Sequence, residues 1–194
     1  DFTVSGKVED THGLQSFTVD GATVASGTGG TWSYTITRGV NTRKNFSVIA
    51  KDKAGRETKQ DYSIFCDTEK PVLTITNPDT DLQGAASLAT GNYTFRGAVQ
   101  DAGSGVATFK YMITQTELAT DDAIITSAES GTGWETVPAS SFSVQKELIA
   151  GTTAHTGKLH EGNWYLYLYA TDSVGTKSVQ KRVFAVDKDS PTLM

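Results

Sequence analysis

The chain has 194 residues, a net charge of −5 and 37% hydrophobic residues, a composition typical of a folded globular protein. Lysines and arginines are scattered, which argues against a nucleic-acid partner, and no apolar run approaches the ~18 residues of a membrane span. The single cysteine, Cys66, excludes an internal disulfide and a cysteine-rich metal site. The 29 threonines and 19 glycines favour an all-β protein, because threonine is common in strands and glycine in turns.

Alternating apolar and polar side chains predict short β-strands along the whole chain. In the first half the pattern covers 2–8, 14–19, 32–36, 46–50 and 62–66. In the second half it covers 71–75, 93–99, 106–113, 164–170 and 183–186. Glycine-containing turns separate these segments, so the pattern indicates sandwiches of two antiparallel sheets. The one stretch compatible with a helix is 116–125, with Thr116 or Thr120 as its cap.

The sequence contains two copies of one pattern. Residues 2–10 match residues 93–101 at an offset of 91, with an aromatic residue, Thr, Gly, Val and Asp at corresponding positions. Residues 46–55 match residues 166–175 at an offset of 120. The offsets differ by 120 − 91 = 29, so we predict an insertion of 29 residues in the second copy, near 114–139.

The repeat divides the chain into two tandem domains. We predict a first β-sandwich at 1–67 that lacks its first strand, and a second at 68–188 that contains the insertion. The second copy opens with Pro71-Val72-Leu73, which recurs as Pro191-Thr192-Leu193. Residues 189–194 are therefore expected to begin a further repeat, and the chain to be part of a longer array.

The strand alternation also predicts which residues form the two cores. Residues expected to be largely buried in the first domain are Trp32, Phe17, Val48 and Ala50. Their counterparts in the second domain are Trp164, Phe109, Leu166 and Leu168. Cys66 aligns with an apolar strand residue and is expected to be a buried thiol.

Several motifs recur with the spacing of a known family. The second copy reads Gly97-x-Val99-x-Asp101, Gly105-Val106-x-x-Phe109-x-Tyr111 and Gly162-Asn163-Trp164-x-Leu166-x-Leu168-x-Ala170-x-Asp172-x-x-Gly175, and the first copy contains Ala50-x-Asp52-x-Ala54-Gly55. Over nearly its whole length the chain resembles the bacterial immunoglobulin-like repeats of secreted and cell-surface proteins.

The resemblance implies two tandem immunoglobulin-like antiparallel β-sandwiches and an extracellular or bacterial cell-surface location. Members of this family form stalks, adhesins and accessory modules of extracellular enzymes. The partners it implies are neighbouring repeats of the same chain, and a host protein or a glycan. The chain departs from the family pattern in its insertion, and at Arg56 and Thr176, where the family often has Asn. The turns at these two positions are expected to differ in detail.

Three tyrosines alternate with apolar residues in the strand expected at 164–170. If Leu166 and Leu168 face the core, Tyr165, Tyr167 and Tyr169 share the outer face. Such a row, together with Trp134, is suited to stacking on sugar rings or binding a partner protein. We favour a different arrangement, in which the insertion folds back over the row, since monomers rarely leave such a patch open.

Aspartates follow two of the predicted strands at equivalent positions. Asp52 and Asp172 each lie three residues before a Gly, where a carboxylate accepts hydrogen bonds from the backbone and closes an Asx turn. The alternative is calcium at the domain junctions, since tandem extracellular modules sometimes hold this ion there. The carboxylates that flank the junctions are Asp67, Glu69, Asp187 and Asp189. We favour the turn, because no Asp-x-Asp-x-Asp loop is present.

Residues with catalytic potential do not form a known constellation. His155 and His160 are five apart with no helix predicted around them, unlike the histidine pair of zinc hydrolases. Asp121 and Asp122 are adjacent and not opposed as glycoside hydrolysis requires. We therefore expect a non-enzymatic structural or adhesive module, a spacer or stalk without a cofactor. The alternative is a carbohydrate-binding accessory module that uses the exposed aromatics.

Overall fold

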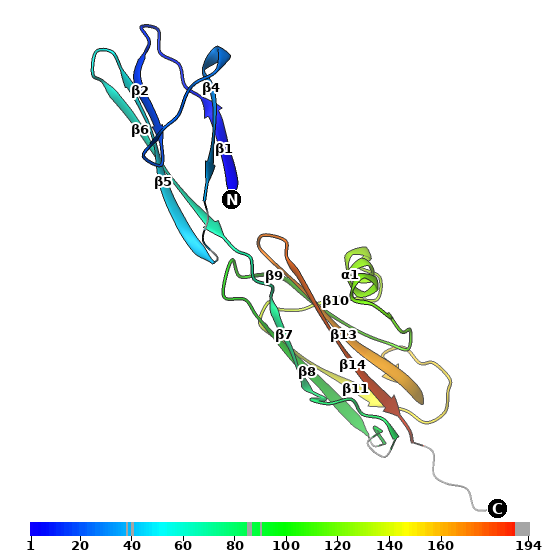
Figure 1. The fold of residues 1–194 in the computed structure, drawn as a ribbon. Coiled ribbons are helices and arrows are strands. Elements are labelled where there is room, and N and C mark those ends of the chain that lie inside the picture. The colour runs from blue at the N-terminus through cyan, green and yellow to red at the C-terminus, as the bar shows by residue number, and fades with distance from the viewer. Residues whose placement is uncertain (38, 40, 85–86, 90, 189–194) are drawn as a thin grey trace, which may run out of the picture. The chain divides into compact units, whose positions relative to one another are not determined.

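The computed structural model describes residues 1–37, 39, 41–84, 87–89 and 91–188. The chain forms two compact units, unit 1 (Asp1–Thr68) and unit 2 (Glu69–Met194), with the boundary one residue after the predicted one. Residues 189–194, where a further repeat is expected, lie outside the described part. Both units are built from β-strands, and the fold is all-β, with one α-helix among the described residues (Figure 1). None of the described helices is long and apolar enough to span a bilayer.

Unit 1 is a sandwich of a two-stranded and a four-stranded sheet. The small sheet pairs β1 (Phe2–Lys7) with β4 (Thr31–Ile36). The large sheet has the order β3-β2-β5-β6, and all its neighbours are antiparallel. Its strands are β2 (Leu14–Val19), β3 (Ala22–Thr23), β5 (Thr42–Asp52) and β6 (Glu57–Cys66). A single 3₁₀ turn, Thr28–Gly30, precedes β4.

Unit 2 is a sandwich of two four-stranded sheets. One sheet has the order β12-β11-β8-β7 and the other β10-β9-β13-β14. The first contains β7 (Val72–Asn77), β8 (Asn92–Gln100), β11 (Ser141–Leu148) and β12 (Lys158–Leu159). The second contains β9 (Val106–Thr114), β10 (Glu135–Thr136), β13 (Gly162–Asp172) and β14 (Lys177–Val186). The sets β7-β8-β11 and β9-β13-β14 reproduce the two sheets of an immunoglobulin-like fold.

The core of unit 2 lies between its two sheets. It is formed by inward-facing residues of both, among them Phe95, Phe109 and Phe184, which are fully buried. Leu166 and Leu168 are fully buried as well, and Trp164 is buried, so the predicted core of this copy is confirmed. The indole N–H of Trp164 donates to the carbonyl of His160 at 2.8 Å, so its one polar group is satisfied.

The core of unit 1 is smaller and less covered than predicted. Phe17 and Cys66 are buried as expected. Trp32, Val48 and Ala50 are only partly buried, which corrects the prediction of a fully enclosed core. The reason is the architecture, since the described sheet that faces β5 and β6 holds only β1 and β4.

Most of the 29 extra residues between the matched strands of unit 2 lie in two places and not in the single insertion predicted near 114–139. β4 pairs with β1 and β11 pairs with β8, so β4 and β11 are equivalent strands. Trp32 lies opposite Gly6, and Phe142 lies opposite Gly97, which sets their offset at 110. The offset is 92 for β2 and β9 and 120 for β5 and β13. Of the 29 extra residues, 92 − 91 = 1 therefore lies between β8 and β9, 110 − 92 = 18 lie between β9 and β11, and 120 − 110 = 10 lie between β11 and β13.

The paired glycines explain why this equivalence holds despite unlike sequences. A Cβ atom at Gly97 would lie 2.5 Å from the Phe142 ring, and one at Gly6 would lie 3.0 Å from the Trp32 ring. In each copy, therefore, an aromatic side chain of the neighbouring strand occupies the space above a glycine.

Candidate functional site

The predicted tyrosine row lies on the outer face of β13. Leu166, Leu168 and Ala170 contribute to the core between the sheets. Tyr167 and Tyr169 belong to a separate apolar cluster on the other face of the same sheet, and Tyr165 packs against it. The alternation along the strand thus assigns the two faces as predicted.

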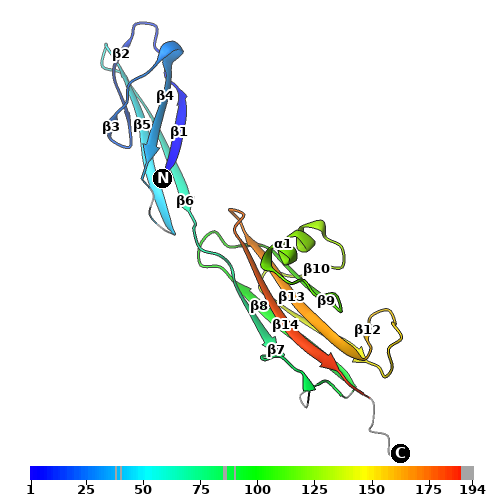
Figure 2. The same ribbon diagram turned by 45° about the vertical axis from the view of Figure 1, so that its right-hand side comes forward.

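The helix α1 (Asp121–Ser130) covers this face (Figure 1). Thr120 is its N-cap, with the hydroxyl accepting from the backbone N–H of Ala123 at 3.2 Å, and Gly131 ends it in the left-handed conformation with φ 79°. Ile124 and Ala128 are its buried residues, four apart on one side of the helix. Figure 2 shows the helix beside β13 and β14 from a second direction. The helix lies further along the chain than the predicted 116–125, because these two residues set the face that packs on the sheet.

The polar ends of the covered side chains are satisfied by the same segment. The indole N–H of Trp134 donates to the Ser127 hydroxyl at 3.0 Å. The Tyr169 hydroxyl faces the Glu129 carboxylate, which pairs with Lys177. Burial raises the pKa of Tyr169, and the hydrogen bond from Lys177 lowers the pKa of Glu129. Both shifts maintain a neutral phenol beside an ionised pair at neutral pH.

The aromatic row is therefore not an open binding platform. Tyr167 is fully buried, Tyr169 is 3% exposed and Trp134 is 9% exposed. Tyr167 and Tyr169 are thus covered, as expected, by the added segment, which includes Trp134. Tyr165 is half-buried, with its ring stacked on Tyr167 at 6.0 Å and the Lys181 ammonium 5.7 Å from its centre. It is the one member of the row that is only partly buried.

Aspartates close the turns at the strand ends, as predicted. Asp52 Oδ1 accepts hydrogen bonds from the backbone N–H groups of Ala54 at 2.9 Å and Arg56 at 2.8 Å. Asp172 Oδ1 accepts the equivalent bonds from Val174 at 2.9 Å and Thr176 at 2.8 Å. The departures from the family pattern fall here, and each supplies a further donor: the Arg56 guanidinium in unit 1 and the Thr176 hydroxyl in unit 2 contact Oδ2.

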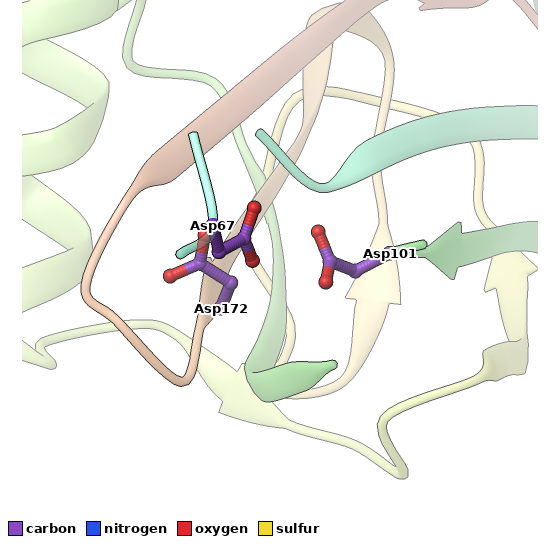
Figure 3. Close-up of side chains that lie close together, drawn as sticks. All are labelled: Asp67, Asp101 and Asp172. Atoms are coloured by element: carbon purple, nitrogen blue, oxygen red, sulfur yellow. The ribbon is translucent and has the colours of Figure 1, made fainter. Parts of the chain in front are cut away.

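A third turn of this kind surrounds Asp101, which follows β8. Its Oδ1 accepts hydrogen bonds from the backbone N–H groups of Gly103 at 3.1 Å and Gly105 at 2.7 Å. A carboxylate oxygen of Asp101 lies within 4.8 Å of one of Asp172, and Figure 3 shows both side chains. Asp67, also labelled there, belongs to unit 1. Calcium takes six to eight oxygen ligands, so these two carboxylates of unit 2 do not by themselves define a calcium site.

The four junction carboxylates occupy different environments. Asp67 is buried at the end of unit 1, whereas Glu69 is exposed in unit 2, where its carbonyl oxygen lies 2.9 Å from the Thr176 hydroxyl. Asp187 is exposed just beyond β14, and its backbone N–H donates to Leu88. Glu69 and Asp187 thus lie near opposite ends of β14, about 30 Å apart for a strand of 10 residues. Asp189 lies outside the described residues.

The remaining polar candidates are engaged in structure. His160 is buried, with its ring 5.2 Å from that of Trp164 and its Nδ1 3.0 Å from the Glu161 carbonyl oxygen. Asp121 and Asp122 form the first turn of α1, where their charge favours the helix N-terminus. His155 is exposed in the segment after β11.

An apolar groove in unit 1 was not predicted from the sequence. It has a volume of about 650 Å³ and runs between β1 and β6. Its floor contains Trp32, Phe46 and Val48, and its rim contains Tyr62, which is 48% exposed and stacked on Phe46. The sequence offered one indication of this groove: the first copy was expected to lack its first strand, and a sandwich without that strand leaves part of its core uncovered.

No protein-family model and no curated protein matches the chain. Among solved structures, the chain is similar to the fibronectin(III)-like modules of CbhA from Clostridium thermocellum, with 12% identity, a TM-score of 0.44, and coverage of 96% of this chain and 85% of that one. It is also similar to a tetra-tandem repeat in the extending region of a large adhesion protein, with 17% identity, a TM-score of 0.37, and coverage of 95% and 45%. A third similar structure comes from a 1.5-MDa bacterial ice-binding adhesin, with 15% identity, a TM-score of 0.38, and coverage of 97% and 57%.

Proposed function

We propose that the chain is a non-catalytic pair of structural repeats from an extracellular bacterial protein, acting as a spacer or adhesive stalk between its neighbours. The observation that carries this proposal is the duplication of one sandwich in direct succession. Unit 1 and unit 2 have the same strand pairings, β1-β4 and β8-β11 in one sheet and β2-β5-β6 and β9-β13-β14 in the other. A rod built from repeats is a common use of such tandem domains.

The local chemistry of the chain supports the same proposal. Asp52 and Asp172 occupy equivalent positions, and their carboxylates accept the backbone hydrogen bonds that close the turns. The bacterial extracellular setting rests on the resemblance of these strand ends to bacterial immunoglobulin-like repeats. Glycan binding through the aromatic row is the less supported alternative, because α1 covers Tyr167 and Tyr169.

A single-molecule pulling experiment tests whether the pair bears load. The full chain, held by its two ends, should unfold in two separate steps, because each unit has its own core. The steps should release at most roughly 240 Å for residues 1–68 of unit 1 and roughly 430 Å for residues 69–188 of unit 2, at about 3.6 Å per residue and less the folded length of each unit. Leu168→Ala should weaken only the longer step. A chain that extends like an unfolded polypeptide would overturn the proposal.

A glycan array separates the structural role from the alternative. The full chain should bind no glycan above background, and Tyr165→Ala should leave this result unchanged. Binding that Tyr165→Ala abolishes would replace the spacer with a carbohydrate-binding module, since Tyr165 is the accessible ring of the row.

A further inference from the structure

The groove of unit 1 has an open sheet edge on one side. Val4, Gly6 and Val8 line it from β1 and the residue that follows, and Tyr62 and Ile64 line it from β6. Within the described residues, β1 pairs only with β4, so the backbone groups on its other side have no strand partner. An apolar groove beside a free strand edge has the shape and the hydrogen-bonding groups to take one more strand.

The equivalent place in unit 2 is occupied by β7. This strand pairs antiparallel with β8, placing Leu73 opposite Val99 and Ile75 opposite Gly97. It also packs against β14 and β13 across the sandwich. The β8 residues under it are closed to solvent, with Phe95 fully buried and Val99 3% exposed.

The same positions in unit 1 are more open. At the offset of 91, Phe95 corresponds to Val4 and Val99 to Val8, both only partly buried. At the offset of 120, Phe184 of β14 is fully buried whereas its equivalent, Ile64 of β6, is partly exposed. The two rims of the groove are therefore the two surfaces that β7 covers in unit 2.

We infer that the groove of unit 1 is the seat of a β-strand of the β7 type, an extended segment with the apolar pattern of residues 72–75. The strand runs antiparallel to β1, with its leucine opposite Val8 and its isoleucine opposite Gly6. These two side chains point into the groove, as Leu73 and Ile75 point into the core of unit 2. The added strand then covers Trp32 and Phe46 in the way that β7 covers the core of unit 2.

The sequence identifies the occupant independently of the groove. The spacing Asp67-x-x-x-Pro71-x-Leu73 introduces β7 and recurs as Asp187-x-x-x-Pro191-x-Leu193. The sequence pattern that introduces β7 thus occurs twice within the chain. The inference concerns the architecture of unit 1 and does not depend on the proposed function.

The experiment supplies such a strand with the spacing that unit 2 uses. Residues 70–91, which contain β7 and its connection to β8, are copied directly ahead of Asp1 in the full chain. Hydrogen exchange should become slower by about tenfold or more in 2–8 and 58–64, because opening the edge then requires breaking strand pairs. Exchange in β8, which already has its neighbour, serves as the internal reference and should not change.

The matched control carries Leu73→Asp and Ile75→Asp in the copied segment only, so it has the same length but cannot enter an apolar groove. Equal exchange in the two grafted chains would overturn the inference. It would also be overturned if the unmodified chain sediments as a dimer with 2–8 already protected, since a second copy would then occupy the groove.

A peptide measurement keeps the inference testable if a grafted chain fails to fold. The peptide with the sequence of residues 70–77 is added to the unmodified chain, and quenching of tryptophan fluorescence by acrylamide is followed. Trp32 is the half-exposed tryptophan, whereas Trp134 and Trp164 are buried. Quenching should fall with the peptide and not with its Leu73→Asp, Ile75→Asp form. No difference between the two peptides counts against the strand seat.

Discussion

The Tyr167 hydroxyl oxygen accepts a hydrogen bond from the backbone N–H of Leu118 at 2.7 Å, across 49 residues of sequence. This bond fixes the segment that enters α1 onto the middle of β13. Leu118 packs on the same apolar cluster that contains Ile124 and Ala128. The segment before the helix and the helix itself therefore close the tyrosine face together.

Removing this hydroxyl tests the attachment directly. Tyr167→Phe retains the ring but leaves the partly buried N–H of Leu118 without its acceptor, so unit 2 should lose about 1–3 kcal/mol of unfolding free energy. Equilibrium urea denaturation measures this loss. Tyr165→Phe is the matched control on the half-exposed ring and should change stability by less than about 0.5 kcal/mol. Equal effects of the two variants would contradict the role given to Tyr167.

Disrupting the helix face should turn the covered tyrosines into an association surface. Ile124→Asp with Ala128→Asp places two charges in the buried side of α1, so the helix should detach from Tyr167 and Tyr169. Each uncovered ring exposes on the order of 150–250 Å². Sedimentation velocity should show oligomers that the control Asp122→Asn, on the exposed side, does not form. A double variant that stays monomeric would mean that the row is stable without its cover.

Equivalent core positions in the two units should differ in their sensitivity to truncation. Leu168 is fully buried, so Leu168→Ala should cost about 2–5 kcal/mol in unit 2. Its counterpart at the offset of 120, Val48, is partly exposed in the groove, so Val48→Ala should cost about 1 kcal/mol or less. Denaturation curves followed separately for the two units give both values. A larger cost at Val48 would show that the groove of unit 1 is closed in solution.

Acid should weaken unit 1 through Asp52. Its hydrogen bonds, first from the Arg56 backbone N–H, lower the pKa of Asp52 below its usual value. A carboxyl with a lowered folded-state pKa stabilises the fold above its unfolded pKa of about 3.9, and this contribution is lost as the pH falls through the folded value. The unfolding temperature of unit 1 should therefore fall less steeply in Asp52→Asn than in the unmodified chain below about pH 4. Parallel curves would contradict this assignment.

Local patterns carried much of the prediction. The alternation of Tyr167 and Leu168 assigned the two faces of β13, because a strand side chain points to one face or the other. Asp52 and Asp172 were recognisable as turn residues because an Asx turn is built within five consecutive residues. Thr120 was recognisable as one of two possible helix caps for the same reason.

Features that depend on contacts between distant strands could not be predicted from the sequence. The equivalence of β4 and β11 divides the extra length of unit 2 in two, but the strands share little sequence and are matched by the glycines opposite them, Gly6 and Gly97. The position of α1 was shifted because Ile124 and Ala128 match the tyrosines of β13, and helix propensity carries no information on that match.

The sequence by itself determined that the chain is all-β, where its strands turn and which residues of β13 share a face, because these features follow from the local conformational preferences of neighbouring residues. It also determined that the chain repeats, because the two copies share one residue pattern. Only the tertiary structure decided that Tyr167 is covered while Tyr165 stays accessible, and that Trp32 lines an open groove while Trp164 is enclosed. Exposure depends on which other segment packs across a residue, and that segment lies about 50 residues away for Tyr167. For Trp32, no described strand covers that place.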